Sequence, residues 1–192
     1  MEELKVSTIF ISKQGELSEN FEKFKQIINK KKINVIVVDK GDCLKIEDNL
    51  YFDILWPNKS NLMKENVLNN NSIVCKLRFT NFSMLCTGDI EEIAEKQILR
   101  EYKNNLNVLN SDILKVGHHG SKTSSTEEFI RVVKPELALI GVGENNKFGH
   151  PNKEVVERLI KLNSRIFRTD IMGEIVIKVD KKGRIVIKQF IK

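Results

Sequence analysis

Short apolar runs and amphipathic segments alternate along the chain, and their order predicts a mixed α/β fold. Two early runs, Val6–Ile11 and Ile33–Val38, are predicted strands, and the second is rich in β-branched residues, as expected of a strand buried on both faces. Between them, Leu17–Asn29 repeats apolar residues at helical spacing and is a predicted amphipathic helix.

The middle of the chain predicts two hairpins. Cys43–Ile46 and Leu50–Leu55 form the first, and Ile73–Phe79 and Phe82–Cys86 form the second around a two-residue turn. Such a turn places Cys75 opposite Cys86, where packing of two small residues is favoured over a redox pair. The polar, Asn-rich stretch 57–71 between the hairpins is a predicted surface loop, a kind of segment that often carries function.

The second half of the chain alternates strands and helices and predicts βαβ units that end in a hairpin. The predicted helices are Ile90–Tyr102, Thr126–Val133 and Asn152–Leu162, the predicted strands are Asp112–Val116, Leu137–Val142 and Arg165–Phe167, and the closing hairpin is Gly173–Val179 with Arg184–Phe190.

Composition narrows the class of protein without naming a function. A length of 192 residues predicts a single domain. The net charge of +6 is compatible with a polyanionic partner, but a generally lysine-rich proteome explains it equally simply and is the favoured explanation. The three cysteines have no CxxC spacing, which argues against a zinc ribbon and favours a reducing compartment. With no membrane-spanning apolar stretch and no visible signal peptide, the chain is expected to be cytoplasmic.

All three histidines follow predicted strands, in Gly117-His118-His119-Gly120 and Gly149-His150-Pro151, and Asp89 follows another. Parallel strands would bring these ends to one edge of a sheet. A carboxylate and imidazoles suit Zn²⁺ or Mn²⁺, and the bound metal would activate water. Taken alone, Asp89 is better explained as a helix cap, and Gly-His-Pro is a common turn.

The segment Ser121–Ser125 leads into a predicted helix N-terminus. Its hydroxyls, its backbone amides and the Lys122 charge could hold a phosphate, or the segment could be a plain polar cap.

The order of these motifs resembles the metallo-β-lactamase-like domain at the C-terminus of ComEC-type competence proteins, which take up DNA. The matching motifs are Asn71-Ser72, Thr87-Gly88-Asp89, the run Leu114–Ser124, Gly149-His150-Pro151 and Arg168-Thr169-Asp170. The resemblance covers nearly the whole chain. It implies an αββα sandwich, a divalent metal site and hydrolysis of phosphodiesters, with DNA as substrate.

The resemblance also implies roles for individual residues. Metal ligands are expected at Asp89, at His118 as one residue of the pair His118 and His119, and at His150. Catalytic roles are expected at His118, His119 and Lys122, and substrate binding at Asn71, Ser72, Ser121, Lys122 and Ser124. Asp89 corresponds to the bridging carboxylate of the family.

One departure from the family changes the expectation for this chain. The signature His-x-His-x-Asp-His is absent, so residues 1–192 are expected to form a single domain, N-terminally incomplete, that lacks the first strands and this motif. Metal binding and hydrolysis by the isolated chain are then expected to be weak or absent, and an exposed sheet edge could lead to a homodimer.

Other functions remain open from the sequence. The chain could be a non-catalytic remnant that binds nucleic acid or protein, or a hydrolase of small phosphorylated or ester substrates. The resemblance also implies a bacterial source, and either a cytoplasmic protein or a soluble domain of a membrane protein.

Overall fold

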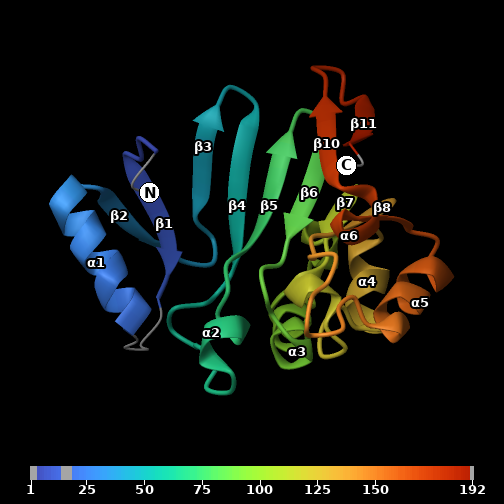
Figure 1. Cartoon of the computed structure of the whole chain (residues 1–192), viewed down its shortest axis with the longest axis horizontal. Coiled ribbons are helices and arrows are strands. Elements are labelled where there is room, and N and C mark those ends of the chain that lie inside the picture. Colours follow the sequence, from blue (N-terminus) through green and yellow to red (C-terminus); the bar gives the residue numbers. More distant parts are fainter. Residues whose placement is uncertain (1–3, 14–18, 191–192) are drawn as a thin grey trace.

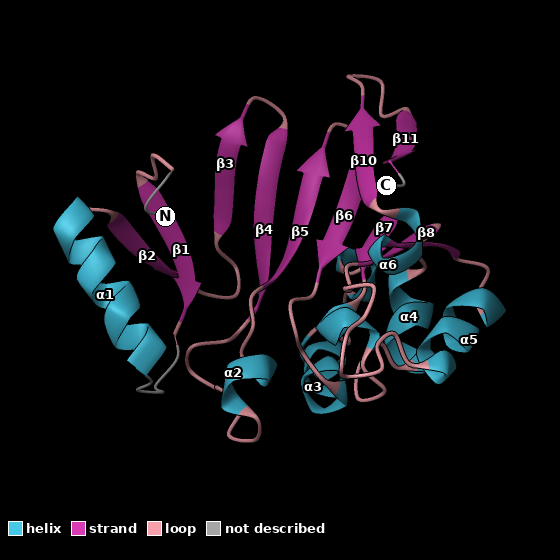
Figure 2. Cartoon of the chain, in the orientation of Figure 1, coloured by secondary structure: helices cyan, strands magenta, loops and turns pink. Residues whose placement is uncertain are grey.

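The computed structural model describes residues 4–13 and 19–190 and shows a mixed α/β architecture built on one large sheet (Figures 1 and 2). Its seven strands lie in chain order: β3 (Cys43–Glu47), β4 (Leu50–Trp56), β5 (Val74–Phe79), β6 (Phe82–Cys86), β7 (Ile113–Lys115), β8 (Leu137–Ile140) and β9 (Arg165–Arg168). Strands β3 to β6 are antiparallel and β6 to β9 are parallel. The predicted order of hairpins followed by βαβ units is therefore confirmed.

Helices cover one face of this sheet, and a hairpin covers part of the other. The helices of this face are α3 (Glu92–Glu101), α4 (Glu127–Val133) and α5 (Lys153–Lys161). Two further short helices are α2 (Val67–Asn70) and α6 (Thr169–Met172), and Met172 of α6 packs on the hairpin side; a 3-10 turn spans Leu106–Val108. Buried residues of α3, α4 and α5 pack with Leu85, Leu114 and Ala138 of the sheet. The hairpin of β10 (Glu174–Val179) and β11 (Ile185–Phe190) packs beside Phe82 and Ile113. These two residues point to the face of the sheet opposite to Leu85 and Leu114, because side chains alternate between the two faces along a strand.

The N-terminal part of the chain forms a separate small unit (Figure 1). Strands β1 (Thr8–Ser12) and β2 (Asn34–Val38) pair with each other in parallel and form their own two-stranded sheet, and α1 (Glu19–Lys31) connects them. The expectation that Ile33–Val38 is buried on both faces is wrong, because β2 pairs only with β1 and most of its residues are partly or fully exposed. The predicted helix start at Leu17 lies outside the described residues.

Local sequence signals explain the helix starts near the site. Thr126 accepts a hydrogen bond from the Phe129 amide at the start of α4, and Asn152 accepts one from the Glu154 amide at the start of α5. In the described part of the chain, no helix is long and apolar enough to cross a membrane.

The metallo-β-lactamase sandwich expected from the motifs is not established by this topology, which supports the coarser description of helices on a multi-stranded sheet.

Candidate functional site

The loops that follow β6, β7 and β8 meet at one edge of the main sheet, as parallel strands require. Backbone hydrogen bonds join them directly: the His118 amide donates to the Gly88 carbonyl at 3.0 Å, and the Asn152 amide donates to the Gly120 carbonyl at 2.8 Å. The predicted convergence of Asp89, the histidine pair and His150 on one edge is therefore supported by this strand order.

The histidine pair lies in an unusually tight turn. Both residues have left-handed backbone angles, with φ of 46° at His118 and 55° at His119, which is rare outside glycine. The fully buried Ser124 holds this turn, because its hydroxyl donates to the Gly117 carbonyl at 2.8 Å. Ser124 is also a predicted substrate-binding residue, and in the structure its hydroxyl supports the turn.

His119 and Asp89 form the first half of the candidate site. Nδ1 of His119 lies 2.6 Å from the Gly141 carbonyl, and since a carbonyl only accepts, Nδ1 carries the proton. Nε2 then presents its lone pair on the side of Asp89, whose Oδ1 lies 3.7 Å away. Both side chains are about half exposed, at 51% and 43%. A carbonyl that orients an imidazole in this way is a common outer contact of a metal ligand.

His118 and His150 form the second half. Their rings lie 5.9 Å apart and edge to face, and Phe148 stacks on His150 at 6.0 Å. Nδ1 of His118 is buried without a hydrogen-bond partner among the described residues, although Oε1 of Glu91 lies 3.5 Å away. An unpaired buried nitrogen beside a carboxylate is costly in a folded chain, and it marks His118 as a residue with a function to explain.

Burial and the nearby imidazoles His118 and His119 lower the pKa of His150 below its ordinary value of 6.5. We expect an NMR titration of the His150 ring to give a pKa below 6.5. Because the folded pKa lies below the unfolded one, this group's contribution to stability is present above pH 6.5 and is lost as the pH falls through the folded pKa. Replacing His118 by asparagine should move the His150 pKa upward, and an unchanged value would contradict the repulsion between the rings.

Asp89, His118 and His150 were the predicted metal ligands. The structure brings Asp89 to His119 and brings His150 to His118. Among the described residues, no group of three or more His, Cys, Asp and Glu side chains is arranged to hold a metal ion. The oxygen and nitrogen donors of Asp89 and His119 are chemically suitable for Zn²⁺ or Mn²⁺, but two donors are fewer than either ion takes from protein.

The other predicted substrate-binding residues have mixed surroundings. Asn71 is fully buried. Its side-chain amide accepts a hydrogen bond from the Met63 amide and donates to the Met63 and Val67 carbonyls. Ser121 is buried, and its hydroxyl lies 3.0 Å from that of Thr123. These contacts describe residues that order loops.

Lys122 is exposed, and it lines a groove with four glutamates, Glu65, Glu91, Glu92 and Glu154. Because these carboxylates repel a phosphate, the groove does not favour the predicted phosphate contact.

Ser72 lies where a substrate could approach. Its hydroxyl accepts a hydrogen bond from the Asp89 amide at 3.3 Å. Together with Gly88, it lines a cleft of about 600 Å³ whose other wall is the N-terminal unit, with Ile11 and Phe24. The Ser72 contact joins the lining of this cleft to the backbone of Asp89.

Sequence reasoning missed Lys115 and Glu91. Burial lowers the pKa of Lys115, while the Asp89 carboxylate acts in the opposite direction, and the Lys115 ammonium donates to the Val116 carbonyl at 3.2 Å. Glu91 accepts hydrogen bonds from Thr123 and Asn66 besides its approach to His118. The signal for Lys115 was a lysine at the end of an apolar strand, and the signal for Glu91 was its position two residues after Asp89.

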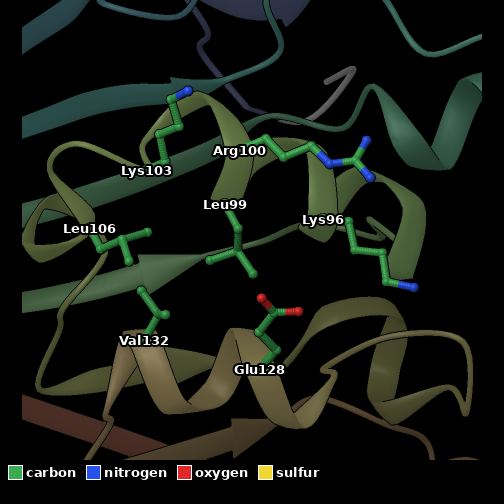
Figure 3. A pocket seen from close by; sticks show the side chains of 7 residues that line it. All are labelled: Lys96, Leu99, Arg100, Lys103, Leu106, Glu128 and Val132. Carbon is green, nitrogen blue, oxygen red and sulfur yellow. The ribbon is translucent and has the colours of Figure 1, made fainter.

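A second groove, of about 440 Å³, lies between α3 and α4 and is lined by none of the predicted site residues (Figure 3). Its cations Lys96, Arg100 and Lys103 come from α3 and the segment after it, and Leu99 points from α3 towards α4. With three cations against one carboxylate, Glu128, this groove is more basic than the groove beside Lys122, which Lys96 also lines (Figure 3).

Comparison with known proteins adds a family relationship. The chain is 34% identical over 171 residues to ComE operon protein 3 of Bacillus subtilis, an alignment that covers 89% of the chain and 21% of that protein. It is 30% identical to competence protein ComA of Neisseria gonorrhoeae over 71% of the chain, and 33% identical to recombination protein 2 of Haemophilus influenzae over 66%.

These alignments cover only 19% and 15% of the last two proteins, so the chain spans about a fifth or less of the length of these relatives. No model of a known protein family matches the chain. The similarity nevertheless extends over most of the chain and recurs in three bacteria, and the chain is therefore a homologue of one segment of the ComEC-related competence proteins.

Proposed function

We propose that this chain provides part of a hydrolytic site for phosphodiesters, with DNA as the substrate, in a competence-related protein. The observation that carries the proposal is the pair Asp89 and His119, with an imidazole nitrogen and a carboxylate oxygen 3.7 Å apart on one side of a sheet edge. The competence names of the relatives support DNA uptake as the setting.

Each residue of the pair would have a defined part. Asp89 would supply a carboxylate and His119 a neutral Nε2, already oriented by the Gly141 carbonyl, to one divalent ion. When bound, such an ion supplies Lewis-acid activation of a phosphodiester. Because two donors do not complete a site, we propose that further ligands come from outside the described residues of this chain.

His118 and Lys115 would act on the substrate. The imidazole of His118, which lies beside His150, could donate a proton or a hydrogen bond to a phosphate oxygen. The Lys115 ammonium, held in the field of Asp89, adds positive charge close to the place where a phosphate would lie.

An Asp89→Asn variant tests the proposal. With millimolar Mn²⁺ and bis(p-nitrophenyl) phosphate as the probe, we expect weak hydrolysis by the wild-type chain and at least a ~10-fold loss in the variant, because the amide does not replace an anionic ligand. Calorimetric titration should likewise show weaker binding of Mn²⁺ to the Asp89→Asn variant than to the wild type.

The matched control is Asp48→Asn, which changes a carboxylate that is 93% exposed in the turn after β3. It should leave both hydrolysis and metal binding unchanged. Equal activity of the wild type and Asp89→Asn would overturn the assignment and leave Asp89 as a loop residue.

A second candidate function is non-catalytic binding of nucleic acid. The groove between α3 and α4 favours it, because Lys96, Arg100 and Lys103 gather there on a chain of net charge +6 (Figure 3). Salt-sensitive binding of DNA that survives Asp89→Asn, without any hydrolysis by the wild type, would favour this alternative over the enzyme.

A further inference from the structure

Cys75 and Cys86 lie directly opposite each other on the antiparallel strands β5 and β6. Both are free thiols and both are partly buried. Residues opposed in this way have Cα atoms about 4.5–5.5 Å apart. A disulfide spans Cα separations of about 4.4–6.8 Å, so the pair can be bridged without moving the backbone.

The surroundings make the two thiols chemically unequal. The hydrogen bond between them raises the pKa of Cys75 and lowers the pKa of Cys86. Lys115, which is the partner of Cys86 in the register of β6 with β7, contributes a positive charge that also lowers the pKa of Cys86. Cys86 is therefore the better nucleophile and Cys75 is placed to resolve the product.

The third cysteine differs in both respects. Cys43 is exposed, but its pKa is raised, first by its hydrogen bond with Asp53. In the register of β3 with β4 it stands opposite Asp53 and not opposite a thiol. Cys43 is thus an accessible thiol with a raised pKa and no thiol opposite it, and it serves as an internal comparison.

We propose that Cys75 and Cys86 form a reversible dithiol–disulfide pair, a modification site that reacts with peroxides. The Cys86 thiolate attacks one peroxide oxygen and releases hydroxide, which gives a sulfenic acid. The Cys75 thiol then attacks that sulfur, and the sulfenic oxygen leaves as water. The two sulfurs lose two electrons, the peroxide gains two, and a dithiol such as dithiothreitol reverses the change.

The position of the pair gives it a consequence for the candidate site. Cys86 is the last residue of β6 and is followed by Thr87, whose hydroxyl donates to the Lys115 carbonyl at 2.8 Å, and then by the turn that carries Asp89. Oxidation would tie the base of this turn to β5 and would remove the Cys86 thiol beside Lys115. The proposal stands on the cysteine geometry alone and does not depend on a hydrolytic function.

The test treats the folded full chain with hydrogen peroxide and then alkylates it with iodoacetamide after unfolding. We expect a loss of about 2 Da and alkylation of Cys43 only, with Cys75 and Cys86 recovered in one cross-linked peptide. Dithiothreitol should restore alkylation of all three cysteines. Alkylation of all three after peroxide, or a bridge that involves Cys43, would overturn the proposal.

Matched variants separate pairing from general oxidation. Cys43→Ser should form the bridge as the wild type does, whereas Cys75→Ser should stop at an oxidised Cys86 without the loss of mass. In the folded wild type at neutral pH, Cys86 should also react with iodoacetamide at least ~10-fold faster than the more exposed Cys43. This rate needs no variant, so it tests the proposal even if Cys75→Ser fails to fold, and a faster reaction at Cys43 would contradict it.

Discussion

Replacement of Glu95 by alanine is expected to lower the free energy of unfolding by about 3–5 kcal/mol. Glu95 lies on the inner face of α3 and is 1% exposed. Its carboxylate accepts hydrogen bonds from the Ser125 and Thr126 amides, at the end of the loop that carries the histidine pair. Alanine would leave both amides buried without an acceptor and would leave the nearby Arg158 without this counter-charge.

Urea unfolding measures this loss of stability, and two further variants of the same helix serve as comparisons. Glu95→Gln keeps one acceptor oxygen and should lose less stability than the alanine variant. Glu92→Ala removes an exposed carboxylate that pairs with Lys96 and should cost no more than about 1 kcal/mol. A cost at Glu95 equal to that at Glu92 would show that the loop does not depend on the buried carboxylate.

Replacement of Gly120 by alanine is the second large expected effect, with a loss of at least ~2 kcal/mol in the free energy of unfolding. Gly120 has a φ of 80°, and a Cβ there would lie 2.6 Å from the Pro151 side chain and 3.1 Å from its Cα. Because the Pro151 ring and backbone cannot swing away, the histidine turn and the His150 loop would separate. Thermal unfolding measures the loss, and the chemical shifts of the His118 and His150 rings report the separation.

Variants at two glycines of the neighbouring loop separate the two causes of this loss, which are backbone strain and the collision with Pro151. Gly149 has a φ of 68° with nothing near its missing Cβ, so Gly149→Ala measures backbone strain alone, at about 1–2 kcal/mol. Gly143 has open space and no left-handed φ, so Gly143→Ala should leave stability unchanged or raise it by up to about 1 kcal/mol. A Gly120→Ala variant no less stable than Gly149→Ala would contradict the collision with Pro151.

Much of the main sheet could be predicted because its signals are local. A two-residue turn at Thr80-Asn81 sets the register of β5 with β6, so the opposition of Cys75 and Cys86 followed from counting residues outward. The predicted helix starts, Thr126 and Asn152, are the capping residues of α4 and α5 in the structure. The convergence of the loops after β6, β7 and β8 followed from the rule for parallel strands.

Two features could not be predicted, because they depend on contacts distant in the sequence. The apolar composition of Ile33–Val38 could not reveal that this strand would pair only with β1 and stay partly exposed. Equally, His118 and His119 are adjacent in sequence, and only the folded position of Gly141 shows that His119 is the imidazole oriented beside Asp89. The metal-ligand and substrate-binding roles assigned from the sequence stay predictions.

The separation of the β1–β2 sheet from the seven-stranded sheet has a mechanical consequence for the cleft beside Ser72. Within the described residues, the two sheets share no ladder of paired strands, so side-chain packing and the segment joining β2 to β3 set the width of this cleft. A rotation of the N-terminal unit as a rigid body would widen it without breaking a strand pair. The cleft next to Asp89 is thus bounded by one wall that continues from the main sheet and by another that no strand pairing ties to that sheet among the described residues.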